Sequence, residues 1–186
     1  MDALLPQAYL IGLIVLLGAA AVVVARQILR VRGDEVTLAK LERNDGSGPA
    51  DAATLYELAS VQLRKRLYGQ AAENLKLAVK RAEAENEPSE AQALIQNALG
   101  FALAAQNNYK TAIRHYRLAL EAKPDYPVAL NNLAFALEKQ LKQDEAKETY
   151  EKVLSLDGSN KTARKRLRLL GGSSGVNSQA ASKQAS

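Results

Sequence analysis

The stretch Ala93–Tyr126, ALIQNALGFALAAQNNYKTAIRHYRLALEAKPDY, decides the fold of this 186-residue chain. Its pattern is defined by Leu99, Gly100, Leu103, Ala112, Tyr116, Ala119 and Pro124. Small side chains at Gly100 and Ala112 let two antiparallel helices approach closely, and Tyr116 fills the space between them. Pro124 ends the second helix, because proline lacks the N–H that a helix interior needs. The stretch therefore predicts a helical hairpin.

The same pattern recurs on both sides of this hairpin. Residues Pro127–Asn160 repeat it in phase, at Leu133, Ala134, Leu137, Ala146, Tyr150 and Val153, with Gly158 in the place of the proline. Residues Ala52–Glu85 repeat it more loosely, at Leu58, Ala59, Ala71, Leu75 and Ala78. The third copy of the alanine follows the second by 34 residues, and the second follows the first by 41. The seven extra residues, around Asn86–Gln92, are about two helical turns and leave the apolar faces aligned.

A period of 34 residues with this pattern resembles the tetratricopeptide repeat (TPR). The alternative is a set of generic amphipathic helices. The resemblance covers Ala52–Asn160 and implies an all-α fold, a three-repeat TPR α-solenoid with repeats 52–85, 93–126 and 127–160. We expect helix pairs at Ala52–Arg66 with Gly69–Ala84, Pro88–Gln106 with Tyr109–Ala122, and Tyr126–Gln140 with Gln143–Leu156.

A seventh helix, Lys161–Leu170, is predicted to close the TPR domain, which would span residues 52–170. Ala163, Leu167 and Leu170 share one face, whereas Arg164, Lys165, Arg166 and Arg168 lie elsewhere. A stacked array leaves an open apolar face at its end, and a helix with a polar back is needed to cover it. Capping is therefore the simpler interpretation of this basic helix, and nucleic-acid binding is the alternative. The tail, residues 171–186, has the composition of a disordered segment.

The N-terminal residues 1–32 are predicted to form a transmembrane anchor with a basic flank. Ala8–Ala25 contains no charged residue, and with Leu4–Gln7 the segment would, as a helix, be roughly 33 Å long, enough to cross a bilayer core. A cleavable signal peptide is the alternative, but no Lys or Arg precedes the segment. Arginines at 26, 30 and 32 predict that the repeats face the cytoplasm or stroma and the N-terminus a lumen. Residues 33–51 are predicted to be a juxtamembrane linker.

Composition limits the chemistry. The chain has no cysteine and one histidine, His115, so we expect no metal site, no cofactor and no enzymatic activity. Known nucleotide-binding and nucleophile motifs are missing from the sequence. The net charge of +5 permits an anionic membrane or an acidic protein as a partner. Nucleic acid is not the expected partner.

The TPR resemblance also implies a concave binding groove, lined by positions 2, 5 and 9 of each repeat. The candidate groove residues are Tyr56, Leu94, Asn97, Phe101, Val128, Asn131 and Phe135, with Ala53 and Ser60 at the remaining positions. The two phenylalanines and two asparagines, in register in adjacent repeats, suit a peptide whose side chains meet rings and whose backbone meets amides. Alternatively, Phe101 and Phe135 only pack between hairpins. No cation occupies the nine positions, so gripping an acidic carboxyl tail is not expected.

One N-terminal span, a short basic flank and three repeats resemble the photosystem I assembly factor family of cyanobacteria and plastids. The run LIQNALGFALAAQNNYKTAIRHYRLALEAKPDYPVALNNLAFALE carries this resemblance. It implies a single-pass thylakoid protein that helps photosystem I subunits to assemble or remain stable. The alternatives are a TPR adaptor for another membrane complex, and a basic surface that binds RNA or anionic lipid. Fold alone does not choose among them.

Overall fold

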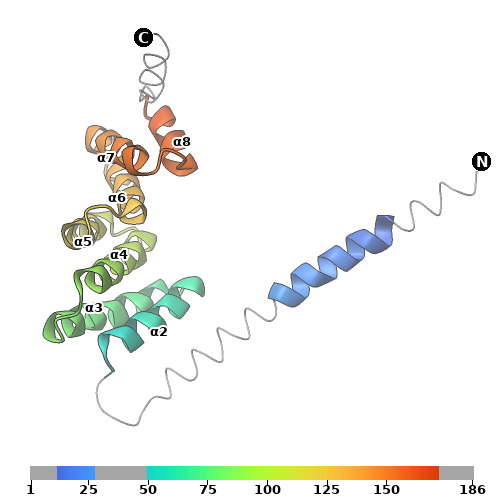
Figure 1. The fold of residues 1–186 in the computed structure, drawn as a ribbon, viewed down its shortest axis with the longest axis horizontal. Coiled ribbons are helices and arrows are strands. Elements are labelled where there is room, and N and C mark those ends of the chain that lie inside the picture. The colour runs from blue at the N-terminus through green and yellow to red at the C-terminus, as the bar shows by residue number, and fades with distance from the viewer. Residues whose placement is uncertain (1–11, 28–49, 172–186) are drawn as a thin grey trace, which may run out of the picture. The chain divides into compact units, whose positions relative to one another are not determined.

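The computed structural model describes residues 12–27 and 50–171, and the chain divides into two units, Met1–Gly48 and Pro49–Ser186 (Figure 1). In the first unit, residues 12–27 form a helix with exposed apolar side chains such as Leu16 and Val23. The predicted anchor thus lies partly outside the described residues, as do most of the predicted linker and tail. Among the described residues, no helix combines the length and apolar character required to cross a bilayer.

The second unit contains the seven predicted helices. They are α2 (Ala52–Arg64), α3 (Tyr68–Ala84), α4 (Ser89–Ala105), α5 (Tyr109–Ala122), α6 (Pro127–Lys139), α7 (Gln143–Leu156) and α8 (Lys161–Leu169). Asp51, Asn108 and Asn160 cap the starts of three helices, because each side chain accepts a hydrogen bond from a backbone N–H three residues later. Pro127 opens α6, where its missing N–H costs nothing. The all-helical TPR array expected from the sequence is present.

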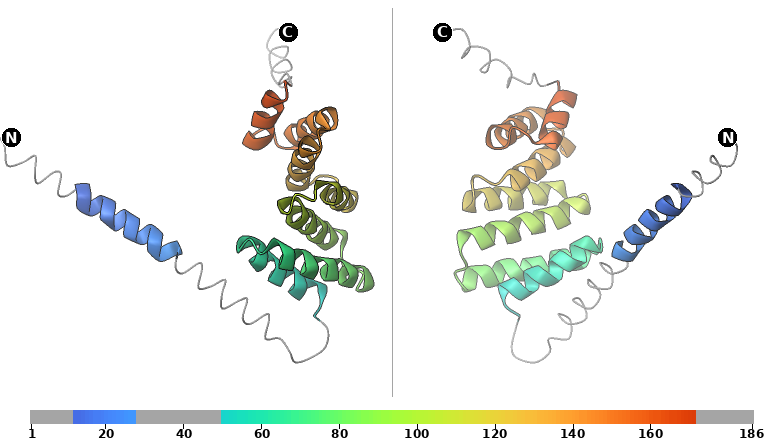
Figure 2. Two further views of the ribbon diagram at one scale, coloured as in Figure 1. Left: turned by 180° about the vertical axis from the view of Figure 1, so that it is seen from behind. Right: turned by 45° about the vertical axis from the view of Figure 1, so that its right-hand side comes forward.

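The helices form two rows. Each helix packs against the next one along the chain, and α4 also contacts α2 and α6. The helices α2, α4 and α6 therefore make an inner row, with α3, α5 and α7 outside it, and α8 continues the stack beyond α7 (Figure 2).

Small residues set the spacing between the rows. Ala59, Ala71, Ala112 and Ala146 are completely buried where helices meet, and larger side chains fill the centre of each hairpin. Leu75, Tyr116 and Tyr150 occupy the same repeat position and are almost inaccessible to solvent. A Cβ on Gly100 would lie only 2.6 Å from Cε1 of Tyr116, so this close approach requires glycine, as the sequence pattern predicts.

The turn inside each repeat uses a left-handed residue that is not glycine. Arg66, Asn107 and Leu141 have φ of 61°, 62° and 61°, and each follows the first helix of its repeat. The N–H of the next residue then bonds to a carbonyl five residues back, as from Leu67 to Gln62 at 2.8 Å. Because of this turn α2 ends at Arg64, two residues before the predicted end.

The seven extra residues between the first two repeats lengthen α3 and α4 to 17 residues each. The corresponding helices of the other repeats have 13 or 14 residues. The longer hairpin brings Glu85 to the start of the array, where its Oε2 accepts a hydrogen bond from the backbone N–H of Ala52 at 3.3 Å. Glu85, the residue that follows α3, thus accepts one backbone N–H at the start of α2.

Candidate functional site

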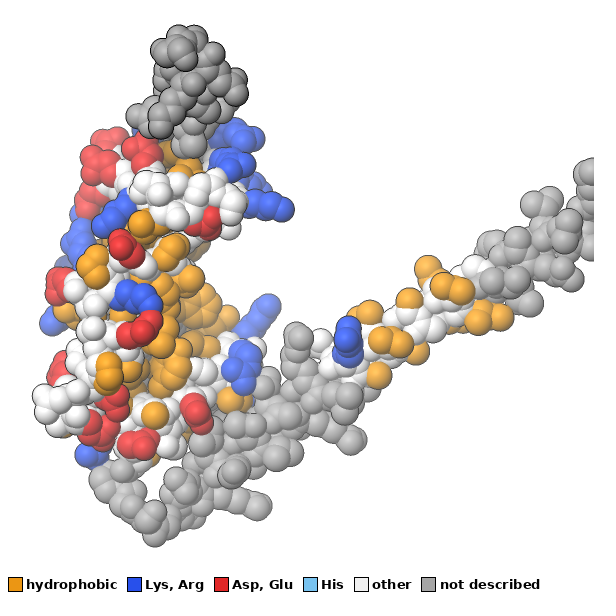
Figure 3. Space-filling view, in the orientation of Figure 1, with side chains coloured by type: hydrophobic (Ala, Val, Ile, Leu, Met, Phe, Trp, Pro, Cys, Tyr) orange, Lys and Arg blue, Asp and Glu red, His pale blue; other side chains and the backbone are white. Residues whose placement is uncertain are grey.

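Two hollows lie along the inner row of helices. The larger, which we name the C-terminal hollow, has a volume of about 360 Å³ and is lined by Phe101, Ala104, Ala105, Asn107, Tyr109, Tyr116, Asn131, Asn132, Phe135, Tyr150, Thr162 and Arg166. The smaller N-terminal hollow, about 120 Å³, is lined by Ala52, Ala53, Tyr56, Glu87, Ala91, Leu94 and Ile95. Apolar side chains gather on this indented side of the array (Figure 3).

The two phenylalanines are held in the same way in successive repeats. The ring of Phe101 meets Tyr68 edge-on, with centroids 6.4 Å apart, and the ring of Phe135 meets Tyr109 edge-on at 6.5 Å. Each tyrosine comes from the start of the second helix of the preceding repeat. Phe101 nevertheless keeps 44% of its surface exposed, and Phe135 is half-buried. Both rings therefore pack between hairpins and also present surface to the C-terminal hollow.

The two asparagines at equivalent positions differ in their hydrogen bonds. Asn97 donates through Nδ2 to the Tyr126 hydroxyl at 3.3 Å, and its Oδ1 accepts from Nδ2 of Asn132 at 3.0 Å. The Oδ1 of Asn131 is buried and has no hydrogen-bond partner among the described residues. One repeat later, the places of Tyr126 and Asn132 are taken by Asn160 and Arg166.

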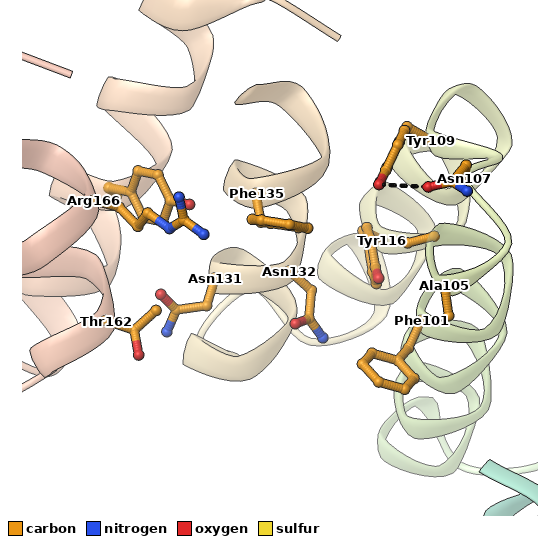
Figure 4. Close-up of a pocket in the computed structure, with 12 residues that line it drawn as sticks. Phe101, Ala105, Asn107, Tyr109, Tyr116, Asn131, Asn132, Phe135, Thr162 and Arg166 are labelled. Carbon is orange, nitrogen blue, oxygen red and sulfur yellow. Dashed lines mark hydrogen bonds between the residues drawn. The ribbon is translucent and has the colours of Figure 1, made fainter. Parts of the chain in front are cut away.

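Neither replacement serves Asn131. Asn160 uses its Oδ1 to cap α8, accepting from the N–H of Ala163 at 3.0 Å. Arg166 pairs with Glu138 instead, through Nη1 and Oε1 at 3.1 Å. The polar bridge over Asn97 thus separates the two hollows, whereas Asn131 lies in the wall of the C-terminal hollow with its hydrogen-bonding capacity unfilled (Figure 4).

The helix α8 forms a wall of the C-terminal hollow as well as a cap. Thr162 and Arg166 line the hollow from α8, and the guanidinium carbon of Arg166 lies 5.2 Å from the ring centroid of Phe135 (Figure 4). Glu138 also accepts a hydrogen bond from the Tyr150 hydroxyl at 3.4 Å. Burial and the Glu138 charge raise the pKa of Tyr150, with Arg166 opposing them, so this hydroxyl stays protonated as a donor.

The seven sequence-predicted groove residues are divided by the structure. Phe101, Asn131 and Phe135 line the C-terminal hollow. Tyr56 and Leu94 line the N-terminal hollow. Asn97 lies in the bridge between them, and Val128 is 53% exposed but lines neither hollow.

Sequence reasoning missed Arg166, the one cation that lines the C-terminal hollow. The sequence pattern predicts Lys161–Leu170 to be a cap, with nucleic-acid binding as the alternative, and the predicted groove positions come from the first three repeats alone. A signal was available, because Arg166 follows Asn132 by 34 residues, one repeat period. Treating α8 as the first helix of a fourth, incomplete repeat would have placed Arg166 beside the groove.

His115 lies outside both hollows, in the contact between α4 and α5. Its Nδ1 is 2.8 Å from Oε1 of Gln96. Burial, with the nearby charges of Arg114 and Lys76, lowers the pKa of His115, which favours a neutral imidazole. Its partner and position are those of a packing residue.

Comparison with known proteins identifies tetratricopeptide repeats in this chain. Models described as "TPR repeat" and "Tetratricopeptide repeat" match residues 100–140 and 127–160. The chain is 33% identical to the ycf37 protein of Guillardia theta over 172 residues, 92% of this chain and 96% of that protein.

It is also 33% identical, over 158 residues, to the tetratricopeptide repeat domain-containing protein PYG7, chloroplastic, of Arabidopsis thaliana. That match covers 85% of this chain but 52% of PYG7, so the chain spans about half of that protein's length. Among solved structures, the first TPR of Spaghetti (RPAP3) bound to an HSP90 peptide superposes with a TM-score of 0.60 at 21% identity. The superposition covers 65% of this chain and 90% of the RPAP3 chain, and it shows a likeness of fold.

Proposed function

The chain belongs to the ycf37 family of tetratricopeptide repeat proteins, and from this premise we propose that it is a membrane-anchored scaffold that binds protein clients in its concave groove. The observation that carries the binding proposal is the C-terminal hollow. Two partly exposed rings, Phe101 and Phe135, and an amide with unfilled hydrogen-bonding capacity, Asn131, line one cavity of about 360 Å³. Aromatic anchors beside a side-chain amide suit an extended or helical peptide segment.

The proposed anchor is the uncharged segment that ends at Ala25. Its described part exposes apolar side chains all along residues 12–24, which is the surface that lipid accepts. The arginines that follow favour a single-pass topology with the N-terminus in a lumen and the repeats on the cytoplasmic or stromal side. A tethered groove meets clients of the same membrane at a raised effective concentration.

We place the protein at the thylakoid membrane and take photosystem I subunits as its first candidate clients. The placement is supported by the sequence resemblance to photosystem I assembly factors and by the plastid location in the name of PYG7. A complex with stromal subunits that dock onto a membrane core is the kind of client that a tethered groove serves. The function is help in assembly or stability, without chemistry of its own.

Crosslinking from the groove tests client binding directly. A photoreactive phenylalanine analogue at Val128, a predicted groove position that is 53% exposed, should yield adducts with a client in native membranes. The same analogue at Leu77, which is 50% exposed on α3, serves as the control. Adducts that form equally from both positions would reject the groove as the binding surface.

The double variant Phe101→Ala/Phe135→Ala should then weaken capture of that client by about 2 kcal/mol or more, roughly 30-fold, if the rings are anchors. Because each ring also meets a tyrosine edge-on, a modest fall in melting temperature is expected, with helicity kept. Leu77→Ala removes a comparable exposed side chain away from the groove and should leave capture unchanged. Unchanged capture by the double variant would show the rings to be idle.

Topology is tested by protease added to sealed vesicles with the cytoplasmic or stromal side outward. The repeat domain should be digested while the N-terminus is protected. Protection of the repeat domain would reject the proposed orientation.

The photosystem I role predicts that deleting the gene lowers photosystem I relative to photosystem II. The fragment Asp51–Leu170, freed from the membrane, should restore less photosystem I than the full chain, because the tether is lost. An unchanged ratio of the photosystems, under steady growth and light stress, would reject the assembly role and leave the scaffold without this client.

A further inference from the structure

The C-terminal hollow carries one charge in its lining, the guanidinium of Arg166. Its position is one repeat period after Asn132, whose amide bonds to Asn97 in the preceding repeat. Between the third repeat and α8, the cation Arg166 therefore stands in the place of a neutral bridging amide. It pairs with Glu138, and the Oδ1 of Asn131 has no hydrogen-bond partner among the described residues. Arg166 therefore places a positively charged group at the α8 end of the hollow.

The guanidinium of Arg166 has donors to spare. It carries five N–H groups in a planar fork, and one bond, from Nη1 to Oε1 of Glu138, accounts for part of them. Its side chain is 35% exposed and lies over the ring of Phe135. The ammonium of Lys139 lies 5.3 Å from the centroid of the same ring, although Lys139 does not line the hollow. Glu138 is the one acidic residue in contact with this cluster among the described interactions.

An occupant complementary to this hollow combines an apolar side chain with a carboxylate. The apolar part would lie between Phe101 and Phe135, and the carboxylate would reach Arg166 at the α8 end. Charged hydrogen bonds to a guanidinium are shorter and stronger than neutral ones, which makes this pairing selective as well as attractive.

We propose that Arg166 recognises an acidic side chain of the client, so that the groove selects a segment with a large apolar residue followed closely by Asp or Glu. This inference rests on the proposed binding of clients in the groove. It makes α8 a specificity element in addition to a cap. A free C-terminal carboxylate is the other source of the same chemistry, and the peptides described below distinguish it from an internal acidic side chain.

The test uses the full chain in a mild detergent and an array of end-blocked synthetic peptides. Each peptide carries one Phe or Leu in a Gly-Ser background. A single Glu, Gln or Lys is placed at one of the positions that follow it, and the array covers these positions one at a time. Binding is measured by fluorescence polarisation. Wild type should bind the best Glu peptide roughly three- to tenfold more tightly than its Gln counterpart, and the Lys peptide least.

Three variants identify Arg166 as the source of this preference. Arg166→Gln should reduce the Glu-over-Gln preference to less than about twofold. Arg168→Gln removes the same charge from an exposed position of α8 outside the hollow, and should keep it. Glu138→Gln removes the competing carboxylate and should increase it, a result that a purely structural role of Arg166 does not give. Circular dichroism confirms that each variant is folded.

The outcomes separate this inference from the binding proposal. If peptides bind but Glu and Gln are equivalent, or Arg168→Gln removes the preference as fully as Arg166→Gln, the recognition role of Arg166 is wrong and groove binding stands. If tight binding requires a free C-terminal carboxylate on the peptide, the proposal that Arg166 recognises an internal acidic side chain is wrong. If no peptide binds the wild-type chain while the Val128 crosslink also fails, the groove proposal is refuted as well.

Discussion

Replacing Gly100 by alanine should destabilise the array, against the usual effect of this change in a helix. Alanine is favoured over glycine inside a helix by about 1 kcal/mol. Here the new Cβ would lie 2.6 Å from Cε1, 2.7 Å from Cδ1 and 3.1 Å from Cζ of Tyr116, whose ring is 1% exposed. Overpacking of this kind costs about 1–3 kcal/mol. We expect a net loss of up to about 2 kcal/mol and a fall in melting temperature of up to roughly 8 °C.

Gly69→Ala provides the matched control. No heavy atom lies within 4 Å of a Cβ at that position, in the first turn of α3, so the variant should be as stable as wild type or slightly more stable. Urea denaturation followed by circular dichroism measures both. In a Tyr116→Leu background, Gly100→Ala should change sign and stabilise, because the ring is gone. A Gly100→Ala chain at least as stable as wild type would refute the close-contact reasoning.

Three further changes have defined directions. Folding lowers the pKa of His115 below 6.5, so the unfolded chain binds more protons than the folded chain below that pH. The free energy of unfolding should therefore fall as the pH drops through 6.5. His115→Gln should flatten this decline, as measured by urea midpoints from about pH 8 to about pH 5. Leu141→Asn should raise the melting temperature slightly, because asparagine tolerates the left-handed backbone (φ 61°) that leucine resists. Asn160→Ala should cost about 1 kcal/mol by removing the cap of α8, seen as faster amide exchange in that helix.

The architecture was predictable because the determinants of a repeat are local and periodic. The buried residues recur at the spacing of the hairpins, as in the pairs Ala112 and Ala146, and Tyr116 and Tyr150. The insertion of seven residues could also be read as added helix length, and α3 and α4 carry it.

The binding surface was less predictable, because it depends on contacts between repeats. Asn97 and Asn131 occupy the same repeat position and are indistinguishable by pattern. Their difference comes from side chains about 30 residues later, a tyrosine for the first and an asparagine that caps α8 for the second. The left-handed turn at Leu141 was also missed, since glycine or asparagine is the usual signal for that conformation.

The order in which the helices touch has a consequence for how the array moves. Since each helix contacts chiefly its neighbours, opening can begin at either end and spread inward without disturbing the middle. The short terminal helix α8 would open first, on a timescale far shorter than that of complete unfolding. Each opening removes Thr162 and Arg166 from the C-terminal hollow. Under the proposed binding of clients in the groove, the fraction of time that the hollow is complete, and with it the rate of client capture, follows the local equilibrium of this last helix.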